Sequence, residues 1–286
     1  MVADMSGDVQ LTVYAGLAGD RNDRGMAGAI LLGEELDRAT GISRQQIGTP
    51  ALPQPGGWAD QLQLAKPELF RLATELDRVL ASGARPLTTM ARCAAGLATL
   101  PVIARHHPDA TIVWFDAHGD SNVPEGRPPA SYLGGMVLTG AAGRWKTGLA
   151  AGLDFGRVIL VGSRDLDPPE RDLIARGALR LVEPGPDLAS RLAAAVGEGP
   201  VYVHIDCDVL EPGLVPTEYQ VPEGLSFADL RAACTVLARS QPIGLEIAEF
   251  ESHWSDGRPA QAAELIDAIG PLLAALRQPT VRRATS

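Results

Sequence analysis

Short apolar segments alternate with longer amphipathic segments along most of the chain. Five segments are rich in Val, Ile, Leu or aromatic residues and have the length of β-strands: 11–16, 111–116, 157–165, 201–209 and 242–250. Six segments have the helical spacing of apolar residues: 24–40, 66–83, 91–107, 168–178, 227–240 and 258–276. Because strands alternate with helices, we predict an α/β fold with a mostly parallel sheet covered on both faces. Neither a repeat nor a long linker divides the sequence, so we expect a single domain over residues 1–286.

Polar, titratable side chains follow the predicted strand at 111–116. Asp116, His118 and Asp120 are spaced two residues apart directly after an apolar run. In parallel sheets, binding sites form at the carboxyl ends of the strands. Burying three such groups costs free energy unless a charged partner lies among them. A lone Asp-x-His segment is usually a turn or a surface pair, so a second cluster is needed to favour a site.

The predicted strand at 201–209 provides that second cluster. His204, Asp206 and Asp208 share one face of the strand, whereas Cys207 points to the other. Carboxylates on one face repel each other unless a cation lies between them. The two clusters together offer four carboxylates and the imidazole of His118, which suit Mn²⁺ or Mg²⁺ better than Zn²⁺. Four aspartates exceed what one ion needs, so we predict a two-metal site.

Composition narrows the classes of partner. The 286 residues are 45% hydrophobic and 21% charged, which is typical of a globular protein with a sizeable core. The net charge of −10 argues against nucleic acid and against an anionic membrane, and it is compatible with a small cationic substrate. The three cysteines have no paired spacing, and the first ten residues lack an apolar segment. We therefore expect a cytoplasmic protein without a signal peptide or a membrane span.

Three motifs in order carry a resemblance to a known family. The segments DAHGD (116–120), HIDCDVLEPG (204–213) and GLEIAEFE (244–251) resemble the signature segments of the arginase and agmatinase (ureohydrolase) family. The resemblance implies a three-layer α/β/α fold with a parallel sheet. It also implies hydrolysis of a guanidino group by a hydroxide that bridges two Mn²⁺ ions, and assembly into a homo-oligomer.

The resemblance assigns metal ligands residue by residue. It implies that Asp116 and Asp206 bridge the two ions. Asp120 would complete one metal site, and His118 with Asp208 would complete the other. Asp120 would also take a proton from the hydroxide and pass it to the leaving nitrogen.

The same resemblance assigns residues to the substrate. Glu249 matches the glutamate that pairs with the substrate guanidinium, although a surface charge beside Glu246 and Glu251 is an alternative. Asp167 matches the position that contacts the substrate's α-amino group, and Asn122 is a further substrate-binding candidate. An N-cap before the helix at 168–178 is almost as good an interpretation of Asp167.

The chain departs from the family pattern at three places. Cys93 stands where the family has a histidine ligand, and it is either a thiolate ligand or a small buried residue. Arg92 replaces an aspartate beside it and requires an acidic neighbour. Gly134 replaces an arginase histidine, which removes an acid/base group and is expected to open space. His204 replaces a small Ser or Thr and is a candidate acid/base, a group that supports the ligands, or a core residue.

These departures resemble one branch of the family, which hydrolyses Nω-hydroxy-L-arginine to L-ornithine and hydroxyurea. The matching segments are 96–110, 132–141 and 204–213. A hydroxyguanidine is less basic than a guanidine, so its leaving side needs less protonation and the histidine can be absent. Alternatives are another guanidino or formimino hydrolase (arginase, agmatinase or formimidoylglutamase), a mononuclear zinc deacylase of the same fold, or a non-catalytic relative with an altered metal site.

Overall fold

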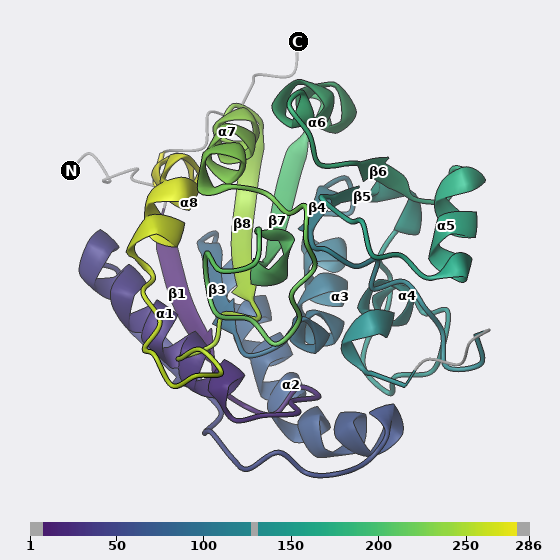
Figure 1. Cartoon of the computed structure of the whole chain (residues 1–286), viewed down its shortest axis with the longest axis vertical. Helices are drawn as coiled ribbons and strands as arrows, with labels where there is room; N and C mark the ends of the chain where they lie inside the picture. Colours follow the sequence, from purple (N-terminus) through teal and green to yellow (C-terminus); the bar gives the residue numbers. More distant parts are fainter. Residues whose placement is uncertain (1–7, 127–130, 279–286) are drawn as a thin grey trace.

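The computed structural model describes residues 8–126 and 131–278, and its strands form one eight-stranded sheet (Figure 1). The order is β2-β1-β3-β8-β7-β4-β5-β6, and every pairing is parallel. The strands are β1 (Val9–Tyr14), β2 (Arg44–Ile47), β3 (Arg85–Met90), β4 (Thr111–Phe115), β5 (Val158–Val161), β6 (Arg180–Val182), β7 (Pro200–Asp206) and β8 (Gln241–Ala248). The prediction of a parallel α/β sheet is confirmed. The first seven residues, where we expect no signal peptide, lie outside the described ranges.

Helices cover both faces of the sheet and make a three-layer α/β/α architecture (Figure 1). The helices are α1 (Arg24–Thr40), α2 (Trp58–Ala81), α3 (Gly96–His106), α4 (Val137–Ala141), α5 (Pro168–Ala175), α6 (Leu188–Val196), α7 (Phe227–Leu237) and α8 (Ala263–Leu276). One core packs against α1, α6, α7 and α8, and the other against α2 to α5. None of the helices in the described ranges has both the length and the apolar character needed to span a bilayer.

Side-chain alternation on the central strands divides them between the two cores. Val201, Val203 and Ile205 of β7 belong to the core under α6, α7 and α8, whereas Tyr202 belongs to the core on the other face. His204 therefore points to the same side of the sheet as Tyr202. The period of two thus decides which face of β7 carries the polar residues.

Several elements differ from their predicted extent. The strands β2, β3 and β6 were not predicted, because their sequences RQQI, RPLTTM and RLV are short or contain Pro and Thr instead of a continuous apolar run. Helix α2 begins at Trp58 instead of residue 66 and passes through Pro67. A proline is common at the start of a helix, so its position suggested a later beginning.

The strand order brings four loop segments together at one edge of the sheet. Strands β3, β8, β7 and β4 are neighbours, so their carboxyl ends adjoin. Cys93, Asp116 and Glu249 follow β3, β4 and β8, and Asp206 ends β7. Segments more than a hundred residues apart in sequence therefore meet at one place.

Candidate metal and substrate site

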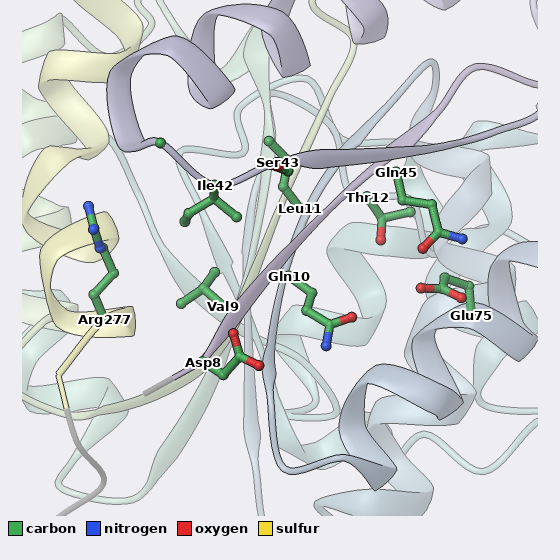
Figure 2. Close-up of a pocket in the computed structure, with 11 residues that line it drawn as sticks. Asp8, Val9, Gln10, Leu11, Thr12, Ile42, Ser43, Gln45, Glu75 and Arg277 are labelled. Carbon is green, nitrogen blue, oxygen red and sulfur yellow. The ribbon is translucent and has the colours of Figure 1, made fainter. Parts of the chain in front are cut away.

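A cavity of about 270 Å³ opens at these carboxyl ends. Its lining contains most of the predicted site residues: Cys93, His118, Asp120, Asn122, Tyr132, Gly134, Gly135, Asp165, Asp167, Glu170, Asp206, Asp208, Tyr219 and Glu249. A larger cavity of about 460 Å³ lies beside the start of β1 and the segment before β2 (Figure 2). None of the predicted site residues lines that larger cavity, so the chemistry belongs to the smaller one.

Asp116 and His118 are held together at the end of β4. The backbone N–H of His118 donates to Asp116 Oδ1 at 2.7 Å, and the His118 ring Nδ1 lies 3.2 Å from the same oxygen. Trp114 Nε1 donates to Asp116 Oδ2 at 3.0 Å. The His118 ring also reaches Asp208 Oδ2 at 3.1 Å. The two sequence clusters are therefore in direct contact, as predicted.

Asp206 and Asp208 sit where β7 passes into a short turn. The backbone N–H of Asp208 donates to Asp206 Oδ1 at 2.7 Å. Asp208 Oδ1 accepts from the backbone N–H of Ala117 at 3.1 Å, which fixes it against the first cluster. Both side chains are almost completely buried, so their carboxylates face each other with little solvent between them.

Cys93 lies among these carboxylates. Its thiol donates to Asp206 Oδ2 at 2.9 Å, and its Sγ is 3.1 Å from His204 Nε2. Burial and the Asp206 carboxylate raise the pKa of this thiol well above its ordinary value. A cation beside the sulfur would reverse that preference, because it stabilises the thiolate. The geometry therefore places Cys93 where the family histidine ligand is expected.

Asp120 has an unusual backbone and an unpaired oxygen. Its φ is +42°, in a region that non-glycine residues seldom adopt and that is frequent at functional sites. Its Oδ2 is buried and has no hydrogen-bond partner among the described residues. Burial, together with the Asp116 carboxylate, raises the pKa of Asp120. A buried carboxylate oxygen without a donor is what a metal ligand presents before its ion is added.

The potential ligand atoms form overlapping groups that suit two cations. Within each group the atoms lie within 4.8 Å of one another, and the groups are Cys93 with Asp116 and Asp120, Cys93 with Asp206 and Glu249, and Asp116 with His118 and Asp208. Burial opposes the charge on His118, but hydrogen bonds to Asp116 and Asp208 raise its pKa to about 12. Without a cation, this proton offsets the charge of the carboxylates. Binding of a metal ion would release it, because a ligating imidazole is neutral. The residues fit a two-metal site.

His204 stands behind Cys93 in a row across three strands. It is paired in register with Trp114 on β4 and with Glu246 on β8. Its ring stacks on Trp114 with centroids 3.4 Å apart and planes at 4°, and its Nδ1 lies 2.8 Å from Glu246 Oε1. Tyr202 donates to Glu246 Oε2 at 2.6 Å. His204 is fully buried and is not part of the cavity lining.

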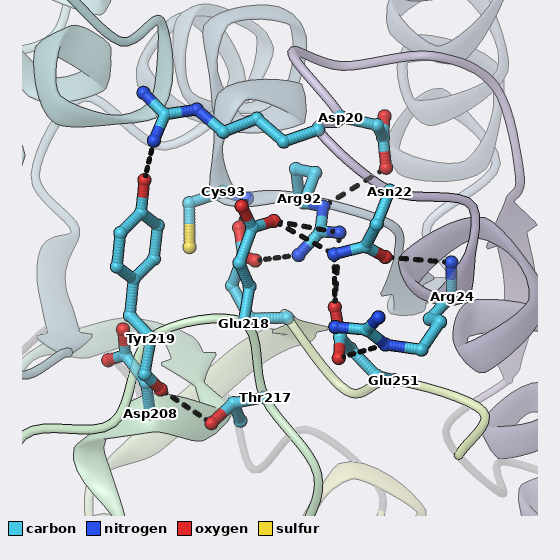
Figure 3. A network of polar contacts seen from close by, with 12 residues as sticks. Asp20, Asn22, Arg24, Arg92, Cys93, Asp208, Thr217, Glu218, Tyr219 and Glu251 are labelled. Atoms are coloured by element: carbon cyan, nitrogen blue, oxygen red, sulfur yellow. Dashed lines mark hydrogen bonds and ion pairs between the residues drawn. The ribbon is translucent and has the colours of Figure 1, made fainter. Parts of the chain in front are cut away.

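Arg92 is completely buried among four carboxylates (Figure 3). It contacts Glu249 at 2.7 Å, Asp20 at 3.0 Å, Glu218 at 3.1 Å and Glu251 at 3.3 Å. The prediction that this arginine requires acidic neighbours is confirmed. These neighbours come from segments far apart in the chain, so no local pattern could have identified them.

Helix α1 leaves room for this guanidinium. A Cβ at Gly25 would lie 2.9 Å from Arg92 Cζ, so the first turn of α1 can pass the side chain only as glycine. The cluster extends from there to Asn22, which donates to Glu251 at 2.7 Å, and to Arg24, whose Nε lies 2.7 Å from Glu251 (Figure 3). The space beside Gly25 and the four carboxylates therefore accommodate the buried Arg92 side chain.

Glu249 is shared between this cluster and the cavity. Its φ is +63°, and only 4% of the residue is exposed, so the surface-charge alternative is wrong. Its Oε2 accepts from Arg92 at 2.7 Å, and its Oε1 accepts from the backbone N–H of Cys93 at 2.9 Å. Burial raises the pKa of Glu249 to about 7, although Arg92 acts in the opposite direction. Both carboxylate oxygens thus already have a donor from the protein.

Asp167 and Asn122 are paired with each other in the lining of the cavity. Asn122 Nδ2 donates to Asp167 Oδ2 at 2.8 Å, and the buried Asn122 Oδ1 has no partner among the described residues. Asp167 is also the N-cap of α5, where its backbone N–H donates to Glu170 Oε2 at 2.9 Å. Asp167 is therefore the N-cap of α5, as one interpretation predicted, and it also lines the cavity, whereas its contact with the substrate stays a prediction.

Gly134 does not open space in the cavity, contrary to our expectation. A Cβ at this position would lie 2.5 Å from Tyr132 Cε1, because the Tyr132 ring fills the volume. The Tyr132 hydroxyl is buried and unpaired among the described residues. Tyr132 and Tyr219 both line the cavity, and neither was predicted as a site residue. The presence of Tyr132 two positions before Gly134 was the only indication in the sequence that this tyrosine could belong to the site.

Comparisons with known proteins agree with this fold and cluster. The chain is 37% identical over 264 residues to the Nω-hydroxy-L-arginine amidinohydrolase of Streptomyces lavendulae, covering 92% of this chain and 96% of that protein. The structure of Entamoeba histolytica arginase with L-ornithine has a TM-score of 0.79 at 18% identity and covers 95% and 98% of the two chains. Proclavaminate amidinohydrolase of Streptomyces clavuligerus has a TM-score of 0.71 at 20% identity, with 95% and 92% covered.

The two structural likenesses show the fold. The model of the Arginase family matches residues 55–268, which include the segments that supply the candidate ligands. Together with the similarity over nearly the whole chain to the Streptomyces lavendulae protein, this match shows that the chain belongs to the arginase family.

Proposed function

We propose that this chain is a single-domain, two-metal amidinohydrolase that converts Nω-hydroxy-L-arginine to L-ornithine and hydroxyurea. The observation that carries the proposal is the pair of ligand groups that share Asp116, one with Cys93 and Asp120 and the other with His118 and Asp208. The relative from Streptomyces lavendulae is named for this substrate. A cysteine at the family's histidine position supports the same branch.

In this proposal the ligands are those that the resemblance assigns, with Cys93 added. Asp116, which belongs to both ligand groups, and Asp206, which contacts Cys93 and Asp208, would help to hold both ions. Asp120 and Cys93 would complete one site, and His118 and Asp208 the other. Mn²⁺ suits the carboxylates better than Zn²⁺, while the thiol makes one site softer than in arginases. When bound, the ions would lower the pKa of a water molecule and so supply a nucleophile at neutral pH.

The protein's own groups position the substrate and move its protons. Asp120 Oδ2 has no donor within the protein, so it is available to accept the proton of the attacking water and to return it to the leaving nitrogen. Among the residues that line the cavity, Glu249 would orient the guanidino carbon, and Asp167 with Asn122 would bind the amino-acid portion. Holding both ends fixes the reacting carbon near the nucleophile.

Arg92 bears on the choice of substrate. It already donates to Glu249, so this carboxylate has less charge to offer a second guanidinium. A hydroxyguanidine is less basic than a guanidine and depends less on that charge. We therefore propose that the paired Glu249 favours Nω-hydroxy-L-arginine over L-arginine.

His204 has a role that differs from acid/base catalysis in this proposal. Its ring is held by Trp114 and Glu246 and faces Cys93, not the cavity. We propose that it orients the sulfur as a positioning residue. Supporting groups of this kind commonly fix the orientation of metal ligands.

We further propose a cytoplasmic homo-oligomer. The three cysteines are free and buried, which suits a reducing compartment. Sedimentation of the purified protein tests the oligomer, and a single-chain mass would contradict it.

Metal analysis combined with a product assay tests the function. We expect two equivalents of Mn²⁺ and preferential release of ornithine and hydroxyurea from Nω-hydroxy-L-arginine, with slower turnover of arginine and agmatine. One equivalent of Zn²⁺ would favour the deacylase alternative instead. Activity that arises only when Cys93→His is combined with His204→Ser, which makes room for the new imidazole, would favour a non-catalytic relative. A better amidine or formimino substrate would identify another hydrolase of the family.

A further inference from the structure

We propose that Tyr132 determines the preference for the hydroxylated substrate by donating a hydrogen bond from its Oη to the oxygen of the Nω-hydroxyl group. This inference rests on the proposed function and assigns a substrate contact to a residue outside the family's motifs. Tyr132 lies in the cavity wall, in the segment where arginases carry a histidine and this chain has Gly134.

The first observation is an unpaired donor. The Tyr132 Oη is buried and has no hydrogen-bond partner among the described residues, although a buried hydroxyl without a partner destabilises the fold. Two other buried atoms of the same cavity lack a partner in the described ranges, Asp120 Oδ2 and Asn122 Oδ1. We assign one of these to the metals and the other to the amino-acid end, which leaves the phenol for the substrate's reacting end.

The second observation is that the ring is fixed before any ligand arrives. Its edge fills the volume beside Gly134, where a Cβ would approach Cε1 to 2.5 Å. The Arg21 guanidinium lies over the ring at 4.6 Å from its centroid, and the neighbouring residue Leu133 is fully buried. Tyr132 therefore presents its hydroxyl with little loss of side-chain freedom on binding.

The third observation is that the hydroxyl shares its cavity with Glu249 and the candidate metal ligands and stays protonated there. Burial raises the pKa of Tyr132 well above its ordinary value, and the neighbouring Glu249 carboxylate adds to this effect while Arg92 opposes it. The phenol therefore remains protonated at neutral pH and is a donor. Both Glu249 oxygens already accept hydrogen bonds from Arg92 and Cys93, so Glu249 responds only to the difference in basicity between the two substrates. A contact with the added oxygen itself is left to Tyr132.

A hydroxyl that is satisfied only by the substrate's own oxygen discriminates strongly. With L-arginine the Tyr132 Oη would stay unpaired, because a guanidinium has N–H donors and no acceptor at that point. Sites built to hydrogen-bond a substrate group reject analogues that lack it much better than apolar sites reject an extra methylene. The same phenol thus acts as a selector without taking part in the proton transfers.

The test is the Tyr132→Phe variant, which removes only the oxygen. We expect kcat/KM for Nω-hydroxy-L-arginine to fall by about 10- to 100-fold, with kcat/KM for L-arginine unchanged within about 2-fold. The thermal midpoint should stay the same or rise, because the lost hydroxyl had no partner. The matched control is Tyr219→Phe, since Tyr219 lines the same cavity but its Oη already accepts from Arg21 at 2.6 Å. The Tyr219→Phe variant should change kcat/KM for both substrates by the same factor.

Each outcome has a defined meaning. The wild type is expected to prefer hydroxyarginine. If it does, and if Tyr132→Phe lowers kcat/KM for both substrates by the same factor or leaves both values unchanged, the inference is wrong and the proposed function stands. A wild-type enzyme that prefers arginine or agmatine overturns both. Calorimetric binding of the two substrates to chelator-treated protein gives a readout independent of turnover, and the hydroxyarginine-selective loss of affinity should appear there as well.

Discussion

Glu249 separates two groups of polar side chains that differ in how completely they are paired. On one side, Arg92 contacts four carboxylates and is completely buried. On the other side, the cavity holds unpaired oxygens of Asp120, Asn122 and Tyr132. The unpaired oxygens are themselves buried, as Arg92 is, so the exposure of these atoms does not explain the difference.

The contrast indicates what each side does. A buried arginine that has all its partners fixes the segments that supply them, including the loop before α1 and the end of β8. Buried oxygens without partners cost stability and are retained where an external group satisfies them. We infer that the paired side holds the cavity in shape and that the unpaired side binds metals and substrate.

Removal of Arg92 should have the largest effect on the paired side. Arg92→Met leaves several buried carboxylates without a counter-charge, and we expect a loss of about 3–5 kcal/mol in the free energy of unfolding, measured by urea denaturation. Arg24→Met is the control, because Arg24 contacts Glu251 and its side chain is 23% exposed. A similar loss in both variants would contradict the special role of Arg92.

Substitution of Cys93 should have the next largest effect, on the metals. Cys93→Ser removes the sulfur beside Asp206, and we expect one of two Mn²⁺ equivalents to bind at least about 100-fold more weakly in calorimetric titration. Cys234→Ser is the control, since Cys234 is also fully buried but lies in α7, away from the cavity. Unchanged affinity for both ions in Cys93→Ser would exclude the thiolate as a ligand.

The pH dependence of the metal-free protein should sharpen the comparison. Burial raises the pKa values of Asp206 and Asp120, and hydrogen bonds to aspartates raise that of His118 to about 12. The folded state therefore retains protons that the unfolded state releases. Stability should fall as pH rises above about 4 for the aspartates and above about 6.5 for His118, by about 1.4 kcal/mol per pH unit for each retained proton.

Asp116 acts in the opposite direction at low pH. Burial favours its neutral form, but hydrogen bonds from His118 hold its pKa below the ordinary value. Its contribution to stability is present above about pH 4 and is lost as pH falls below that value.

Thermal midpoints of the chelator-treated protein should decline from pH 5 to pH 9, and added Mn²⁺ should remove most of the decline. A thermal midpoint that does not change with pH in the presence of chelator would show that the raised pKa values have no effect on stability.

The smallest expected effect concerns the fit of Tyr132 against Gly134. Gly134→Ala places a Cβ against the ring and should cost about 1 kcal/mol, at the low end for overpacking. In a double-mutant cycle, Tyr132→Ala should remove that cost. Gly135→Ala is the control, because a Cβ there has no heavy atom within 4 Å. Additive effects of the Tyr132 and Gly134 substitutions would mean that the ring does not fill this volume.

The sequence predicted the parallel sheet and the meeting of the two aspartate clusters, because both depend on local patterns. Strand β4 is a continuous apolar run, and the period of two on β7 places Asp206 beside His204. Strand β3 has the sequence RPLTTM and was missed, so the position of Cys93 depended on the family resemblance alone. Periodicity detects strands that are uniformly apolar and fails for those that carry Pro and Thr.

Other features of the site depend on tertiary packing and have no local signal. Arg92 and Glu218 are 126 positions apart in the sequence, yet their side chains meet at 3.1 Å. The position of Tyr132 depends on how its ring packs over Gly134, which spacing in the sequence does not specify. The sequence showed that the family histidine is replaced by Gly134, but it did not show that the Tyr132 ring fills the volume beside this glycine.

The contact between Cys93 and His204 has a consequence for how this branch could diverge from arginases. Relative to the family pattern, position 93 has lost an imidazole and position 204 has gained one, so the pair has exchanged a large and a small side chain. With Sγ only 3.1 Å from Nε2, a histidine at 93 would collide with His204. The order of the two replacements therefore matters: a path between the branches avoids this collision if the histidine at 93 is replaced before one is introduced at 204.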